Sequence, residues 1–157
     1  MDPQKEQALI VSLRLLAASP KSRAEVARKL GEKGFRPELV TEVLDEMETK
    51  GLLSDKAFAQ NLISRFTQGQ PSGSRKISFE LKRHGVPATL REEMLAGLEP
   101  EQEAERAREV AQARWERLKN LPDDKRKKRL YDFLIRRGFD FQLVRDIVEE
   151  LESNSQT

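Results

Sequence analysis

Basic side chains grouped on predicted helices are the residues of this sequence best suited to chemistry, and that chemistry is anion binding. Residues 73–84 carry four basic side chains and one acidic one, and residues 123–137 carry seven basic and three acidic ones. Lys and Arg neutralise phosphates, and an aromatic ring among them can stack on a base. A basic helix face equally fits an acidic protein groove, and it is also common as a plain solvated surface. Its recurrence on two helices favours a binding surface.

Helical geometry predicts which of these side chains point outward. If Ile77 and Leu81 face the core, the basic residues of the first segment lie on the opposite side, with Phe79 in their middle. Phe79 either belongs to that surface or packs beneath a neighbouring repeat, and the sequence leaves both open. The same geometry, measured from Leu130, places Asp132 within the outward face of the second segment. The predicted outward basic residues are Arg75, Lys76, Lys82 and Arg83 in one helix and Lys125, Lys128, Arg129 and Arg136 in the other.

A third basic helix is predicted within residues 21–33, where Arg23 and Arg28 are further candidates for binding. Acidic residues share its outward side, so that face is neutral. The helix predicted next, within residues 37–49, carries five acidic residues and no basic one. Since the formal net charge of the whole chain is only +2, any affinity for nucleic acid must come from where the charges lie.

Other kinds of site lack the residues that they need. His84 is the only His, and we expect it to have a structural role where a cation meets a helix C-terminus. Cys is absent, which excludes disulfides and thiolate metal sites and suits a reducing cytoplasm. The glycines of residues 69–76 lack the order of a phosphate-binding loop. We therefore expect a cytoplasmic protein that is not an enzyme, has no cofactor or metal, and does not enter a membrane.

A short sequence motif that occurs three times predicts the helices that hold these residues. Each copy is a Leu, three mostly polar residues, a Gly and an apolar residue, and the copies are about 50 residues apart. A Gly in the left-handed conformation ends a helix there, and the apolar residue folds back onto the Leu. The copies are Leu30 to Phe35, Leu81 to Val86 and Leu134 to Phe139. This period predicts an all-α protein of three tandem repeats.

We predict three helices in each repeat, about nine in all, with repeats at residues 6–52, 53–99 and 100–152. Residues 1–7 form a polar lead-in, and residues 153–157 are expected to be a disordered tail. In the first helix, Leu9, Leu13 and Leu16 share a face. A capping box starts the second helix at Ser22, Trp115 is a core residue, and the loop Gly69 to Ser74 is expected to be the most flexible interior point.

The middle of the chain also carries a family pattern. It runs Gly51-Leu52-Leu53-Ser54-Asp55-Lys56-Ala57-Phe58-Ala59, then Arg65, then Gly73, Ile77, Glu80-Leu81 and Gly85-Val86. With Ser22-Arg23-Ala24-Glu25-Val26 and with Leu134, Gly138 and Phe139, this resembles the RecX family of bacterial recombinase regulators over about residues 9–151. Ser19 and Ser72 stand where basic residues are common in that family.

The resemblance implies an elongated, curved array of three-helix repeats that binds the RecA recombinase filament on DNA. Such a protein limits filament extension, ATP hydrolysis and strand exchange, in recombinational repair and the SOS response. Weak contact with single- and double-stranded DNA, not sequence-specific, is a secondary activity, and we expect a monomer. The resemblance adds Arg65 to the candidate binding residues.

A direct DNA-binding protein with helix-turn-helix-like basic helices is the alternative. The segment Ser22 to Phe35 could pass for part of such a motif. However, the acidic helix that follows it is poorly suited to recognition. Selective binding to one sequence at physiological salt would favour this alternative, and weak, salt-sensitive, unselective binding would favour the filament regulator.

Overall fold

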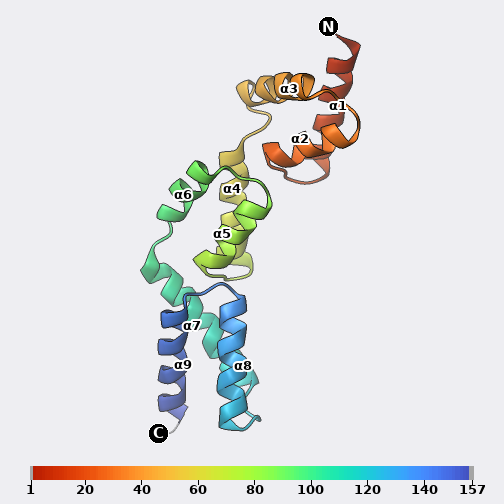
Figure 1. The fold of residues 1–157 in the computed structure, drawn as a ribbon. Coiled ribbons are helices and arrows are strands. Elements are labelled where there is room, and N and C mark those ends of the chain that lie inside the picture. Colours follow the sequence, from red (N-terminus) through yellow and green to blue (C-terminus); the bar gives the residue numbers. More distant parts are fainter. Residues whose placement is uncertain (1, 156–157) are drawn as a thin grey trace. The chain divides into compact units, whose positions relative to one another are not determined.

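The computed structural model describes residues 2–155, and within that range the secondary structure is entirely helical (Figure 1). The all-α prediction is therefore confirmed. The helices fall into three sets of three along the sequence. They are α1 (Pro3–Ala18), α2 (Arg23–Glu32), α3 (Pro37–Thr49), α4 (Asp55–Ser64), α5 (Ser74–Arg83), α6 (Ala88–Ala96), α7 (Pro100–Arg117), α8 (Asp123–Arg136) and α9 (Phe141–Ser155), with a π-helical turn at Arg65–Gly69 after α4.

The chain divides into two compact units that do not coincide with the three predicted repeats. The first unit comprises Met1–Asn61 with Leu81–Arg91, and the second comprises Leu62–Glu80 with Glu92–Thr157. The division passes through α4, α5 and α6. The limits 6–52, 53–99 and 100–152 stay a prediction, and the two units are described separately.

The core of the first unit lies between α1, α2 and α3. Val26 and Leu30 of α2 and Val43 and Met47 of α3 are fully or almost fully buried in it. From α1 the most buried residues are Ala8 and Ser12, whereas Leu13 is 41% exposed. The predicted face of Leu9, Leu13 and Leu16 is therefore wrong for Leu13. Small residues let α1 approach closely, and the Ser12 hydroxyl donates to the Ala8 carbonyl at 2.8 Å, so its burial leaves that donor satisfied.

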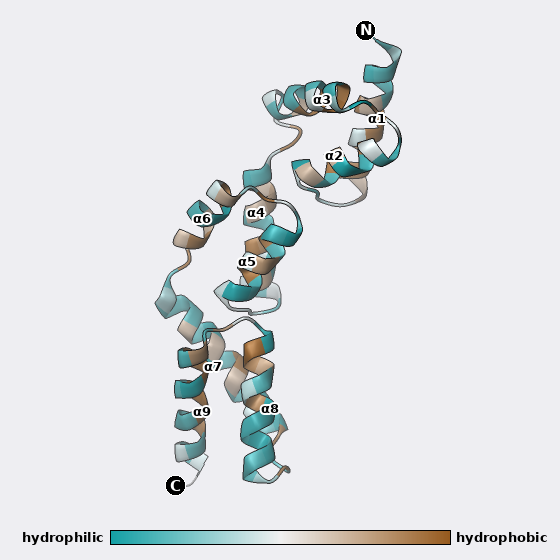
Figure 2. Cartoon of the chain, in the orientation of Figure 1, coloured by the Kyte–Doolittle hydropathy of each residue, from teal (hydrophilic) through white to brown (hydrophobic). Residues whose placement is uncertain are grey.

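The core of the second unit lies between α7, α8 and α9. Trp115 of α7, Leu130 and Leu134 of α8, and Ile147 of α9 are buried in it, which confirms Trp115 as a core residue. In Figure 2 the N-terminal half of α8 is hydrophilic and its C-terminal half is more apolar. This pattern matches the basic run at the start of the helix and Leu130 and Leu134 further along.

The glycines predicted to end the second helices do so in the structure. Gly34, Gly85 and Gly138 have φ values of 90°, 80° and 85°, which is the left-handed region. After each Gly the next backbone N–H donates to the carbonyl of the Leu that begins the repeated motif, as a Schellman turn requires. These bonds are Phe35 to Leu30 at 3.2 Å, Val86 to Leu81 at 3.0 Å and Phe139 to Leu134 at 3.3 Å.

Both ends of the described chain are more helical than predicted. Residues 2–7 are not a simple polar lead-in, because α1 begins at Pro3 and the Asp2 carboxylate accepts from the Gln4 N–H at 2.9 Å. At the other end α9 continues to Ser155, so residues 153–155 of the predicted tail are helical. Ser155 accepts a hydrogen bond from the Trp115 ring N–H at 2.9 Å, which ties this turn to α7. Met1 and residues 156–157 lie outside the described range.

Candidate functional site

The outward face of α8 is a basic surface of the second unit. Lys125, Lys128, Arg129 and Arg136 are all exposed, as the sequence predicted, and Asp132 is exposed among them. Leu130 and Leu134 are completely buried on the other side and fix the rotation of the helix. Within residues 2–155 none of the four cations makes an ion pair or a side-chain hydrogen bond. No direct ion pair therefore neutralises them, and Asp132 is the one acidic residue among them on this face.

The remaining basic residues of this region hold the fold together. The Arg126 guanidinium lies 3.6 Å from the centre of the Trp115 ring and donates to the Trp115 carbonyl at 3.1 and 2.8 Å. Lys127 pairs with Glu152 of α9 at 3.0 Å, and Arg137 donates to the Pro71 carbonyl at 3.0 Å. The structure thus separates the α8 cations into internal and external ones.

The first half of α5, also in the second unit, carries three predicted site residues. Phe79 is 63% exposed, so the alternative in which it packs beneath a neighbouring repeat is wrong in this structure. Arg75 is exposed but engaged, with its guanidinium 4.4 Å from the centre of the Phe141 ring and 4.0 Å from an Asp140 carboxylate oxygen. Lys76 is half-buried, and its Nζ lies 5.6 Å from the centre of the Phe66 ring.

The other predicted site residues are distributed over both units. Arg65 is exposed at the start of the π-helical turn, 5.7 Å from the centre of the Phe66 ring. Lys82 and Arg83 are exposed in the last turn of α5, within the first unit. The candidates are thus divided between the two units, and Arg75 and Lys76 are consecutive residues of α5.

The two candidates on α2 are occupied by acidic partners. The Arg23 guanidinium pairs with Asp45 at 2.8 Å and with Glu48, both on α3, and its pKa is raised because these carboxylates outweigh the effect of burial. Arg28 pairs with Glu32 on its own helix at 2.8 Å. Arg23 is therefore paired by α3 and Arg28 by its own helix, which agrees with the neutral outward face predicted for this repeat.

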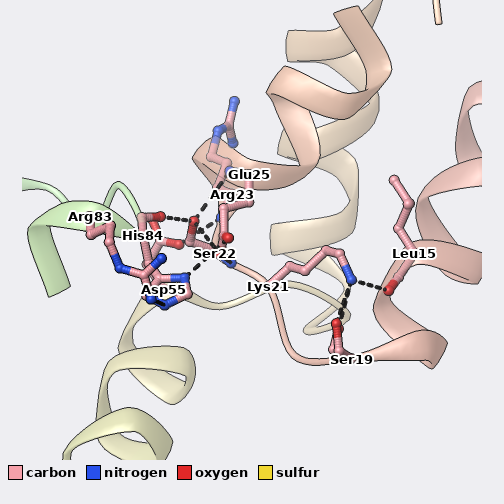
Figure 3. A network of polar contacts seen from close by, with 9 residues as sticks. All are labelled: Leu15, Ser19, Lys21, Ser22, Arg23, Glu25, Asp55, Arg83 and His84. Carbon is pink, nitrogen blue, oxygen red and sulfur yellow. Dashed lines mark hydrogen bonds and ion pairs between the residues drawn. The ribbon is translucent and has the colours of Figure 1, made fainter. Parts of the chain in front are cut away.

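His84 has partners that sequence reasoning did not find, and they join α5 to the start of α2 (Figure 3). Its Nδ1 lies 3.1 Å from Glu25 Oε2, its ring centre is 5.3 Å from that of Phe58, and its carbonyl accepts from the Ser22 hydroxyl. The predicted capping box is present, with the Ser22 N–H donating to Glu25 at 3.1 Å. Burial opposes ionisation of Glu25, but the hydrogen bonds from Ser22 and His84 outweigh it and hold the pKa of Glu25 below its usual range.

A comparable junction joins α5 to α8 in the second unit. The Gly73 N–H donates to the Arg137 carbonyl at 2.8 Å, and the Arg75 N–H donates to the Gly138 carbonyl at 3.1 Å. From α7, Glu103 accepts from the Ser74 N–H at 2.8 Å. The loop predicted to be the most flexible interior point is therefore tied to both α7 and α8. The glycines of this loop were the available signal, since Gly can mark a close backbone approach as well as flexibility.

Three-helix repeats whose second helices end at glycines, with cations on exposed helix faces, define a class of helical repeat protein. The model for the first three-helix domain of RecX matches residues 8–47, and the model for the third matches residues 101–148. The regulatory protein RecX of Chlorobium limicola is 38% identical over 96% of this chain and 92% of its own length. That of Streptomyces coelicolor is 34% identical over 92% of this chain and 79% of its own. The chain belongs to the RecX family of regulatory proteins.

Solved structures support the fold independently. The crystal structure of RecX from Lactobacillus salivarius has a TM-score of 0.83 at 18% identity and covers 97% of this chain and 99% of that one. A second structure of a regulatory protein RecX has a TM-score of 0.81 at 23% identity, over 93% of this chain and 73% of that one. Within residues 2–155, the helices are too short or too polar to cross a bilayer.

Proposed function

We propose that this protein is a negative regulator of a RecA-type recombinase in recombinational repair and the SOS response. It binds in the groove of the RecA–DNA filament and limits filament extension, ATP hydrolysis and strand exchange. Family membership supports the regulatory role. Its action is non-catalytic, because binding alone can block the addition or rearrangement of filament subunits.

The observation that carries this proposal is the contrast between the second helices of the repeats. Arg23 and Arg28 of α2 form ion pairs with α3 and with Glu32, whereas the four cations on the outward face of α8 form no ion pair within residues 2–155. A protein that exposes unpaired cations attracts polyanions, and a nucleoprotein filament is one. The exposed Phe79 adds an aromatic anchor of the kind that dominates binding energy at interfaces.

The deciding experiment measures ATP hydrolysis by RecA filaments already formed on single-stranded DNA. This protein is added in steps below one copy per recombinase subunit. Inhibition at such ratios is expected, because one bound copy at a growing end or in the groove affects many subunits. Inhibition only when the protein is abundant enough to cover the DNA would contradict the proposal and favour direct competition for the strand.

The alternative of a direct DNA-binding protein makes a different prediction in a second assay. Its binding to one DNA sequence would exceed its binding to a shuffled sequence at physiological salt. A filament regulator would bind both sequences weakly and equally. The same protein sample serves both assays, so the two functions are compared directly.

A further inference from the structure

Three of the four exposed cations of α8 lie in a strip with a defined spacing, together with the exposed Asp132. Lys125, Arg129, Asp132 and Arg136 follow one another at steps of four, three and four residues, which keeps them on one side of a helix. At 1.5 Å per residue the strip is about 16 Å long. Lys128 lies beside it. Because consecutive phosphates of a strand rise about 3.4 Å along the axis of a duplex, a strip of this length spans several phosphates.

This strip carries no exposed aromatic or large apolar side chain. The nearby rings of Tyr131 and Phe133 are half-buried, and Arg114 and Arg137 lie 4.7 and 5.1 Å from the centre of the Phe133 ring. Protein interfaces are depleted in Lys at their centres and use aromatic residues as well as Arg as anchors, and this strip offers two Lys and two Arg but no exposed ring. Long, unpaired Lys and Arg side chains without an exposed ring fit the phosphate backbone better than a protein groove.

We propose that the outward face of α8 contacts the phosphate backbone of a nucleic-acid strand without reading its sequence. This inference deepens the proposed function and relies on it for the presence of DNA in the complex. It assigns the DNA contact to Lys125, Lys128, Arg129 and Arg136. The exposed Phe79 is left to other contacts, since it lies on a different helix and its neighbour Arg75 is engaged with Asp140 and Phe141.

The test uses the full chain and a fluorescently labelled oligothymidylate, with no recombinase present. Anisotropy titrations over a series of NaCl concentrations give the slope of log K against log salt. The variant K125Q/K128Q/R129Q/R136Q removes four phosphate contacts, so the slope is expected to become shallower by about 3, at about 0.7 per contact for a single strand. Affinity at low salt is expected to fall more than about tenfold.

A matched control removes the same amount of charge elsewhere. Arg14, Lys33, Arg36 and Lys56 are exposed in the first unit and form no ion pair within residues 2–155. The variant R14Q/K33Q/R36Q/K56Q should keep the wild-type slope. An equal loss in this control would overturn the inference, because total charge and not the α8 strip would then determine binding.

Two further outcomes would also overturn it. One is wild-type DNA binding by the α8 variant. The other comes from a separate binding assay with the recombinase: a variant that keeps DNA binding but loses recombinase binding would make the strip a protein contact. Fluorescence of Trp115 reports whether the variant folds, and if it does not, the pair K125Q/R129Q is measured with an expected change in slope of about half the size. Because no recombinase is present, a wild type that binds DNA but fails to slow ATP hydrolysis would remove the proposed function and leave this inference standing.

Discussion

The backbone N–H of Gly73 donates a 2.8 Å hydrogen bond to the carbonyl of Arg137, and this bond joins the beginning of α5 to the end of α8. The first N–H groups and the last carbonyls of a helix have no partner inside that helix. Here the two helix ends satisfy one another, with opposite ends of their dipoles in contact. In the first unit the Ser22 hydroxyl donates to the His84 carbonyl, so the start of α2 meets the end of α5 in a related way.

Replacing Gly138 by Ala should destabilise the protein more than the same change at Gly34. Both glycines are left-handed, which costs Ala about 1–2 kcal/mol. At Gly138 a Cβ would also overlap the backbone of Lys76, whereas at Gly34 no described atom lies within 4 Å of its position. Urea unfolding should show a loss of about 2–5 kcal/mol for Gly138→Ala and about 1–2 kcal/mol for Gly34→Ala. Equal losses would mean that the junction relaxes freely.

Gly73→Ala tests the close approach without the conformational effect. The φ of Gly73 is not in the left-handed region, but a Cβ there would collide with the carbonyl group of Gly138. We expect a loss of about 1–3 kcal/mol in the free energy of unfolding. Gly69→Ala is the control, since its Cβ would meet no described atom within 4 Å. Its stability should stay within about 0.5 kcal/mol of wild type.

Glu25 should make the stability of the protein depend on acid pH. Burial opposes its ionisation, but hydrogen bonds from Ser22 and His84 lower its pKa in the folded state. The unfolded state therefore binds more protons in this range, and the stabilisation is present above the unfolded pKa and lost as pH falls through the folded one. Between about pH 5 and pH 3, unfolding free energies from urea titrations should fall less for Glu25→Gln than for wild type. Glu109→Gln, at an exposed site, should follow wild type.

Arg126 should stabilise α8 through Trp115. Arg126→Ala removes a guanidinium stacked 3.6 Å from the ring centre and two hydrogen bonds to the Trp115 carbonyl. The expected loss is about 1–3 kcal/mol, measured by the fluorescence of Trp115, the only Trp in the chain. Lys128→Ala, on the exposed side of the same helix, should unfold like wild type. If the two variants were equally stable, the stacking would contribute nothing.

Phe79→Ala should separate binding from folding. The ring is 63% exposed, so the free energy of unfolding should change by less than about 0.5 kcal/mol. If Phe79 anchors the filament contact, half-inhibition of recombinase ATP hydrolysis should need at least about tenfold more protein, as for an interface hot spot. Leu52→Ala, at a residue 49% exposed, is the control and should inhibit like wild type. Unchanged inhibition by Phe79→Ala would exclude the ring from the contact.

Helix ends were predictable from the sequence because they depend on residues a few positions apart. The bond from Phe35 to Leu30 and the capping box at Ser22 both follow from local patterns. The α1 face was not predictable in the same way, because three leucines at helical spacing outweigh Ala8 and Ser12 in any hydrophobic pattern. Which side of α1 is buried depends on how closely α2 and α3 approach it.

The candidate site was predictable in its residues but not in their pairing. The outward direction of the α8 cations follows from helical geometry, and the structure agrees. The contact between Glu25 and His84 joins residues 59 positions apart, and that between Ser22 and His84 joins residues 62 apart. No local pattern spans such separations along the sequence. The sequence therefore predicted a flexible loop before α5 and, for His84, only a role at a helix end.

The junctions at Gly85 and Gly138 also give the repeat array a polarity. Each contact joins two different surfaces, the start of one second helix and the end of the second helix one repeat later, and an association of unlike surfaces can continue without closing. The end of α2 at Gly34 is open among residues 2–155, and α8 starts at Pro122 and Asp123 without a side-chain cap. Among residues 2–155, the last carbonyls of α2 and the first N–H groups of α8 therefore take part in no such junction. The geometry of the junction itself therefore does not limit the number of repeats that can be joined in this way.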